Sequence, residues 1–139
     1  MSKIDINKYL GKWYEIARIP TVFQRDMTKV TAEYVLNEDK TINVINSGYV
    51  NGELIKVTAT ALTTDKDDLL KITFSPYIYS DYKILAVDEN YQNALVGGES
   101  TNKLWILART PRIDKHTYTK FISIANKNGY NTQNLKITD

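Results

Sequence analysis

The feature that most constrains this chain is an alternation of apolar and polar residues with period two, repeated along much of its length. In one run, Val30, Ala32 and Tyr34 alternate with polar neighbours, and later runs repeat the pattern. Such alternation is typical of β-strands with one buried and one solvated face. The β-branched and aromatic residues in these runs suit a pleated surface. The sequence therefore predicts an antiparallel all-β fold.

Turn signals separate the runs at short spacing. The strongest is Asn51-Gly52, a pair favoured in type I′ hairpins. The runs amount to about eight strands, the number expected of an up-and-down ligand-binding barrel, whose closure removes exposed sheet edges. The expected strands cover residues 12–18, 29–36, 42–50, 53–63, 70–74, 82–87, 91–97 and 103–109.

One segment near the C-terminus has helical spacing instead. Asp114 is a suitable N-cap, and Gly129 is a suitable C-terminal stop. Because an amphipathic helix buries one stripe only, we expect it to pack on the outside of the barrel. A short final strand is expected around residues 135–137. The apolar stripe of the helix consists of Tyr118, Phe121, Ile122 and Ala125.

Size and composition narrow the possible functions. A chain of 139 residues corresponds to one domain over residues 1–139. The net charge of +2 argues against nucleic acid as a partner, since a basic stripe is absent. The absence of cysteine excludes thiolate metal sites and thiol nucleophiles. The single histidine, His116, is expected to face solvent in the first helical turn. We therefore expect no catalytic residue, no metal and no cofactor.

Three short motifs resemble the signatures of the lipocalin family. Residues 11–14 form a G-x-W-Y motif on the first strand, residues 80–82 resemble the T-D-Y element with Ser in place of Thr, and residues 105–111 look like the closing motif. The similarity is strongest to bacterial lipocalins and apolipoprotein D. The residues that carry it are Gly11, Trp13, Asp81 and Arg109.

The resemblance implies a lipocalin calyx, an eight-stranded up-and-down antiparallel β-barrel with one C-terminal α-helix packed outside. It also implies a structural contact between Arg109 and Trp13 at the sealed end, worth roughly 0.5–2 kcal/mol as a cation–π interaction. The implied role is to bind, store or transport a small hydrophobic ligand, a fatty acid or a lysophospholipid. Alternatives are a haem or tetrapyrrole carrier, a lipocalin-type enzyme using the same cavity, or an interaction module whose barrel is filled by its own side chains.

The expected ligand site is the inward face of the barrel. That face is mostly apolar with a few polar groups, which is the make-up of a small-molecule pocket. A barrel of about eight strands has room for one small ligand. The expected lining residues are Glu15, Tyr34, Val44, Asn46, Val57, Ala59, Ile72, Phe74, Tyr82 and Trp105.

Two of these residues carry specific expectations. Glu15 is expected to share the inward face with Trp13 and Ala17, either hydrogen-bonded to tyrosines or acting as a polar anchor for the ligand, because an isolated buried charge costs too much. Trp105 is expected in mid-cavity, about 13 Å from Arg109 along its strand.

Localisation and assembly remain open at this level. The chain contains no apolar stretch long enough to span a membrane as a helix, about 18 residues. It also lacks an apolar signal segment and the lipidated cysteine of many bacterial lipocalins. It is therefore expected to be unlipidated and cytoplasmic as written, or exported to the periplasm or outer membrane if a signal was removed. The Tyr77-Ile78-Tyr79 patch suits a peripheral membrane contact or a homodimer, and a monomer is equally compatible.

Overall fold

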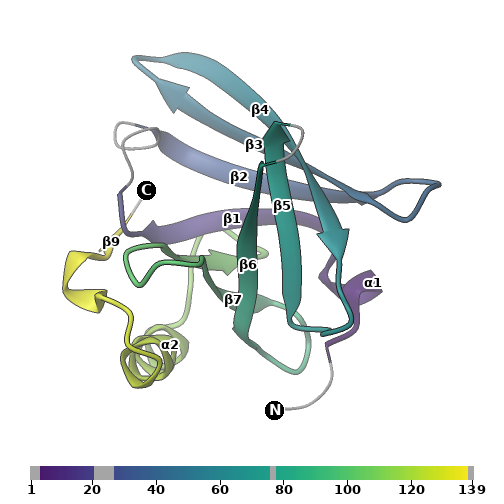
Figure 1. Cartoon of the computed structure of the whole chain (residues 1–139). Helices are drawn as coiled ribbons and strands as arrows, with labels where there is room; N and C mark the ends of the chain where they lie inside the picture. Colours follow the sequence, from purple (N-terminus) through teal and green to yellow (C-terminus); the bar gives the residue numbers. More distant parts are fainter. Residues whose placement is uncertain (1–3, 21–26, 76–77, 138–139) are drawn as a thin grey trace.

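The computed structural model describes residues 4–20, 27–75 and 78–137 (Figure 1). The described elements are α1 (Ile6–Tyr9), β1 (Gly11–Arg18), β2 (Thr28–Leu36), β3 (Ile42–Val50), β4 (Glu53–Thr63), β5 (Leu69–Ser75), β6 (Ile78–Val87), β7 (Asn93–Gly97), β8 (Leu104–Ala108), α2 (Lys115–Lys127), the 3₁₀ turn η1 (Thr132–Asn134) and β9 (Lys136–Ile137).

The strands form a closed antiparallel barrel. Each of β2 to β8 pairs with its neighbour in sequence, β8 pairs with β1, and β1 pairs with β2 to close the ring. The short β9 lies outside the ring and pairs with the end of β1, with Ala17 opposite Ile137. This arrangement confirms the predicted eight-stranded up-and-down barrel with one helix outside it (Figure 1).

The β3–β4 hairpin has the predicted bounds. Asn51 and Gly52 have φ angles of 52° and 82°, the left-handed conformation that a type I′ turn requires at both central residues. Asparagine and glycine adopt positive φ more readily than other residues, so the pair marks the position of the turn. The bounds of the two strands could therefore be predicted correctly.

The predicted strand over residues 91–97 is wrong at its start, because β7 begins only at Asn93. Tyr91 has a φ of 54° and belongs to the preceding turn. The Asp88 carboxylate holds that turn, since its Oδ1 accepts hydrogen bonds from the backbone N–H groups of Gln92 and Asn93 at 2.7 and 3.1 Å. These backbone N–H groups are therefore bonded to the Asp88 side chain and are not available for pairing with a neighbouring strand.

The helix α2 covers the outer face of the barrel. The Asp114 side chain accepts a hydrogen bond from the backbone N–H of Thr117 at 3.1 Å, as expected of the N-cap. His116 is exposed in the first turn, also as expected. The buried side of α2 packs in an outer cluster that comprises Ile16, Ala17, Ile19, Ala86, Leu95, Leu104, Ile106, Ala108, Phe121, Ala125 and Tyr130.

The helix α1 was not predicted from the sequence. Asp5 caps it by accepting a hydrogen bond from the backbone N–H of Asn7 at 3.0 Å, and Tyr9 is buried at its end. This helix lies beside the start of β1 (Figure 1), at what we name the closed end of the barrel. The other end, which carries the β3–β4 turn, is named the open end. In the part of the chain described here, no helix is long and apolar enough to span a membrane.

Candidate ligand-binding site

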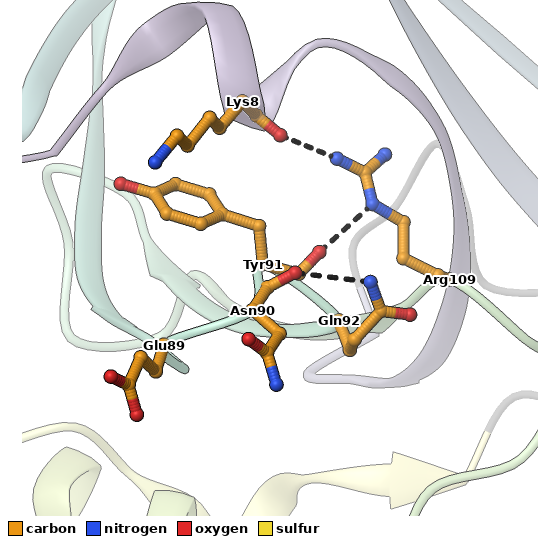
Figure 2. A pocket seen from close by; sticks show the side chains of 6 residues that line it. All are labelled: Lys8, Glu89, Asn90, Tyr91, Gln92 and Arg109. Atoms are coloured by element: carbon orange, nitrogen blue, oxygen red, sulfur yellow. Dashed lines mark hydrogen bonds between the residues drawn. The ribbon is translucent and has the colours of Figure 1, made fainter.

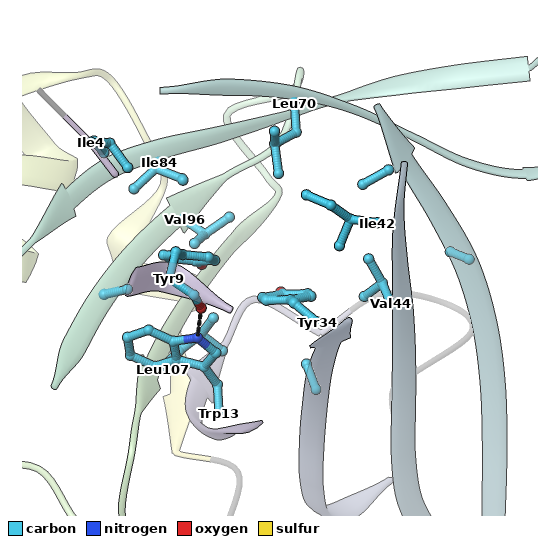
Figure 3. Close-up of a cluster of buried hydrophobic side chains, with 14 residues drawn as sticks. Ile4, Tyr9, Trp13, Tyr34, Ile42, Val44, Leu70, Ile84, Val96 and Leu107 are labelled. Atoms are coloured by element: carbon cyan, nitrogen blue, oxygen red, sulfur yellow. Dashed lines mark hydrogen bonds between the residues drawn. The ribbon is translucent and has the colours of Figure 1, made fainter. Parts of the chain in front are cut away.

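The inward faces of the strands meet in an interior cluster. Strand register places Tyr34 opposite Val44, and Val44 opposite Ala59, so these side chains point to the same face. Figure 3 shows their neighbours converging between the strands. The buried members of the cluster are Ile4, Tyr9, Trp13, Ala32, Tyr34, Ile42, Val44, Ala59, Ala61, Leu70, Ile84, Ala94, Val96 and Leu107.

Trp13 and Arg109 plug the closed end. The Arg109 guanidinium carbon lies 3.7 Å from the centroid of the Trp13 ring, which is the contact expected from the two motifs. Trp13 is fully buried, and its Nε1–H donates a hydrogen bond to the Tyr9 carbonyl at 2.8 Å. The Trp13 indole is thus fixed by the guanidinium over its face and by the hydrogen bond from its Nε1–H.

Arg109 also ties the N-terminal segment to the barrel. Its Nη1 donates to the carbonyl of Lys12 at 2.9 Å, and its Nη2 donates to the carbonyls of Lys8 and Leu10 at 2.9 and 3.0 Å. Its Nε donates to the Tyr91 carbonyl at 3.0 Å, as Figure 2 shows. Because a helix leaves its last carbonyls without internal partners, Arg109 acts as a C-terminal cap for α1.

A depression of about 390 Å³ lies outside this plug. It is lined by Lys8, Glu89, Asn90, Tyr91, Gln92 and Arg109, which are drawn in Figure 2. Arg109 donates hydrogen bonds to backbone carbonyls and stacks on Trp13, so its role here is closure of the barrel.

Three tyrosines meet above the plug. The Tyr82 hydroxyl lies 2.5 Å from that of Tyr9 and 2.6 Å from that of Tyr34. The rings of Tyr9 and Tyr34 stack with centroids 5.4 Å apart. Tyr34 and Tyr82 were predicted from the sequence. Tyr9 was not, because the helix α1 that positions it was not predicted. The sequence signal that could have indicated α1 is Asp5, its N-cap.

Burial keeps these hydroxyls protonated. Desolvation raises the pKa of Tyr34 to about 12, against the opposing effect of its hydrogen bonds with Tyr82 and Tyr9. Desolvation likewise raises the pKa values of Tyr9 and Tyr82 well above the ordinary value of 10.0. The three-tyrosine cluster is therefore an uncharged, hydrogen-bonding floor at neutral pH.

A bulge in β1 changes which residues face inward. The pairing with β8 shifts register between Glu15 and Ala17, so that Glu15 lies opposite Leu107 and Arg18 lies opposite Trp105. Ala17 turns outward into the outer cluster, contrary to the expectation that it shares a face with Glu15. The extra residue of a bulge reverses the alternation beyond it, which strict period-two counting does not anticipate.

The bulge brings two charged side chains together in the barrel wall. The Arg18 Nη1 lies 3.0 Å from the Glu15 Oε1, and the two side chains are 4% and 5% exposed. We expected tyrosine partners for Glu15, or a role as a ligand anchor, and did not expect Arg18 beside it. An arginine three residues after an inward glutamate can be predicted as its ion-pair partner only when the bulge between them is known.

Exposure along the inward face rises from the closed end to the open end. On β4 the exposed fractions of Ala61, Ala59 and Val57 are 1%, 2% and 43%. On β8, Leu107 is 5% exposed, while the inward-facing Trp105 is only partly buried. Since these residues point away from the outer surface, the inward face is tightly packed at the closed end and more exposed toward the β3–β4 turn.

The other predicted lining residues fall along this gradient. Val44 and Ala59 are buried, while Ile72 and Tyr82 are partly buried against the interior cluster. Asn46 is partly buried opposite Val57. The side chain of Phe74 lies outside the described residues.

Asp81 points to the other face and forms an ion pair with Lys71, so it supports the wall from outside. In the proposed membrane or dimer patch, Tyr79 is 49% exposed, whereas Tyr77 and the side chain of Ile78 are outside the described part of the chain. Within residues 4–20, 27–75 and 78–137, no group of three or more His, Cys, Asp or Glu side chains could hold a metal ion.

Comparisons with known proteins agree with this architecture. The family model for a lipocalin-like domain matches residues 4–139. The outer membrane lipoprotein Blc of Vibrio cholerae is 38% identical over 97% of this chain and 82% of its own length. Bovine (Bos taurus) apolipoprotein D is 36% identical over 97% of this chain and 76% of its own length.

The structural comparison gives the same answer. The crystal structure of the cockroach major allergen Per a 4 superposes with a TM-score of 0.78 at 26% identity, covering 98% of this chain and 88% of that one. The closed barrel, the arginine-on-tryptophan plug and the relatives found over nearly the whole length lead to one conclusion: this chain belongs to the lipocalin family.

Proposed function

We propose that this protein reversibly binds a fatty acid or a lysophospholipid inside its barrel, in order to store or transport it. Membership of the lipocalin family supports the broader role of binding or transporting a small hydrophobic molecule. The observation that carries the proposal is the exposure gradient on the inward face of β4, from 1% at Ala61 to 43% at Val57. An apolar wall that is sealed at one end and accessible at the other suits a single acyl chain.

The chemistry of the lumen supports a ligand of this kind. Trp105 offers a flat apolar surface on the wall of the barrel opposite β4. The name of one relative, apolipoprotein D, supports a lipid ligand. The name of another, an outer membrane lipoprotein, supports the exported alternative for localisation.

A haem carrier or an enzyme is the second candidate, and the lumen favours it less. His116 is exposed on α2, outside the barrel, so it does not line the lumen. The polar groups that we expect on the inward face are the three-tyrosine cluster, Asn46 and the pair formed by Glu15 and Arg18. Protonated tyrosines and a paired carboxylate suit hydrogen bonding to a ligand better than nucleophilic attack on it.

Native mass spectrometry of gently purified protein tests the proposal. We expect a co-purified lipid, or uptake of one equivalent of palmitate or of a lysophospholipid by the delipidated protein. Failure of the folded, delipidated barrel to take up either lipid would contradict the proposal. A Soret band after reconstitution with haem, or turnover of a lipid ester, would favour the second candidate.

A further inference from the structure

The chain leaves helix α2 through a sharp turn and then runs along the outside of the barrel. Gly129 has a φ of 83°, and its N–H donates to the Asn126 carbonyl at 3.0 Å. The N–H of Tyr130 donates to the Ala125 carbonyl at 3.1 Å, which completes the hydrogen-bond pattern of a Schellman cap. This cap ends the helix and directs residues 130–137 away from it. We name this segment, which includes η1 and β9, the C-terminal strap.

Three hydrogen bonds join the strap to the turn between β7 and β8. The Tyr130 hydroxyl donates to the Gly98 carbonyl at 3.0 Å in a buried position. The Asn131 backbone N–H donates to the Thr101 carbonyl at 3.0 Å, and its side-chain amide donates to the Asn102 Oδ1 at 2.5 Å. Because alternate turns of an up-and-down antiparallel barrel lie at the same end, this turn belongs to the open end. The strap therefore holds one side of the open end from outside.

The last residue of β7, Gly97, makes room for the strap. An added Cβ at Gly97 would lie 2.3 Å from the Tyr130 hydroxyl oxygen, so the tyrosine packs directly against the outer face of this strand. Gly97 pairs with Leu104, and the next pair along the two strands is Val96 with Trp105. The side chains of Val96 and Trp105 face the interior. Tyr130 thus supports the barrel wall one residue pair away from Trp105.

The opposite side of the open end lacks this support. The β3–β4 hairpin lies across the barrel from β7 and β8. Residues 53–58 of β4 are all exposed, including the inward-facing Val57. In the part of the chain that the structure describes, no hydrogen bond joins the turn residues Asn51 and Gly52 to another segment. The open end is therefore braced at the Trp105 wall and unbraced at the hairpin.

We infer that Tyr130 and Asn131 are positioning residues that hold the Trp105 wall against a bound acyl chain and slow its release. The inference rests on the proposed function, because it gives the strap a role in ligand residence. When the hydrogen bonds of the strap open, the start of β8 loses its outer support, and Trp105 moves more freely away from the ligand. Loosening a wall that the ligand already contacts acts on dissociation more than on encounter. The strap therefore sets the dissociation rate constant and leaves the association rate constant almost unchanged.

Tyr130→Phe tests the inference by removing one hydroxyl group and keeping the ring. Hydrogen exchange of the Asn131 backbone N–H, followed by NMR, measures how often the strap opens. Stopped-flow fluorescence measures association of the lipid that the wild-type protein binds, palmitate or 1-myristoyl-lysophosphatidylcholine, and transfer to excess albumin measures its dissociation. We expect exchange and dissociation each to become about fivefold faster, the effect of one ordinary hydrogen bond on a local opening equilibrium. The association rate constant should not change.

Tyr118→Phe is the matched control. Tyr118 lies on α2 and packs against the same outer cluster as Tyr130, and its hydroxyl forms no hydrogen bond with the described residues. The same chemical change there should leave exchange and dissociation as in the wild-type protein. If exchange accelerates in Tyr130→Phe and dissociation does not, the strap is structural only and the inference is wrong, while lipid binding stands. If the wild-type protein binds neither lipid, the proposed function itself is wrong.

Asn102→Ala covers the case in which Tyr130→Phe does not fold. Asn102 is exposed in the β7–β8 turn, and the substitution deletes the acceptor of the Asn131 side-chain amide without disturbing the core. We expect exchange of the Asn131 N–H and lipid dissociation to accelerate together, by about threefold. Faster exchange with unchanged dissociation would overturn the inference in this variant too. Unaltered exchange in both variants would also overturn it, because the strap would then not depend on these contacts.

Discussion

The closed and open ends of this barrel are built from the same strands but differ in how completely their inward side chains are used. At the closed end, Trp13 and Ile42 are 0% and 1% exposed, and Arg109 joins α1 to the barrel. Toward the open end, Val57 is 43% exposed on the same inward face. The difference indicates that packing is concentrated at the closed end, and it supports our proposal that the ligand enters at the open end.

A pair of matched truncations tests this division, and we expect the largest effect here. Ile42 and Val57 both face inward, on the neighbouring strands β3 and β4. Ile42→Ala should lower the free energy of unfolding by about 2–5 kcal/mol, because it leaves a cavity in a packed region. Val57→Ala should change it by no more than about 0.5–1 kcal/mol. Urea unfolding followed by circular dichroism gives both values, and equal losses would refute the division.

Removing the guanidinium plug should have the next largest effect. Arg109→Ala deletes the contact with Trp13 and leaves the carbonyls of Lys8 and Leu10 without this donor. We expect the free energy of unfolding to fall by about 2–4 kcal/mol. This is more than a cation–π contact alone contributes, because hydrogen bonds from a charged donor are lost as well. Arg109→Lys should retain only part of this stability, since an ammonium group is not planar and cannot stack on the Trp13 ring as a guanidinium does. An unchanged denaturant midpoint in Arg109→Ala would mean that the plug is not what seals the barrel.

The three-tyrosine cluster predicts an effect on stability that is absent at neutral pH and appears only at alkaline pH. The folded pKa of Tyr34, about 12, lies above its unfolded value of 10.0, and those of Tyr9 and Tyr82 are raised in the same direction. Above pH 10 the unfolded state therefore loses protons that the folded state keeps, so stability is intact below pH 10 and falls as the pH rises toward 12. The slope is at most about 1.4 kcal/mol per pH unit for each such tyrosine.

Absorbance of tyrosinate measures the same groups directly. Of the ten tyrosines, the three in this cluster should ionise only above pH 10, because burial raises their pKa values. A single titration of all tyrosines near pH 10 in the folded protein would contradict the buried cluster.

The barrel could be predicted well from the sequence because the signals for its strands, turns and helix lie within short segments of the chain. Period-two alternation and the pair Asn51-Gly52 fixed the bounds of β3 and β4, and the spacing of Asp114 and Gly129 framed α2. The contact between Arg109 and Trp13 followed from family motifs, since it joins residues far apart in the chain. In each case the residue types themselves demand the local conformation or belong to a recognised motif.

What the sequence missed depends on tertiary structure. The bulge that turns Arg18 inward leaves no mark in the alternation of β1, so the partner of Glu15 was not found. The one-turn helix α1 is too short for a periodic signal, and without it Tyr9 could not be placed beside Tyr34 and Tyr82. The exposure of Val57 likewise depends on how neighbouring strands associate around it, which no single strand encodes.

The central claim, a sealed end and a ligand-binding lumen in one barrel, is tested most directly by the two tryptophans. Trp13 is fully buried under Arg109, and Trp105 is partly exposed on the inward face of β8. A bound acyl chain displaces water from Trp105 and not from Trp13. During titration with a long-chain fatty acid, we predict that the change in fluorescence persists in Trp13→Phe and disappears in Trp105→Phe. A response that persists in Trp105→Phe and disappears in Trp13→Phe would contradict the account.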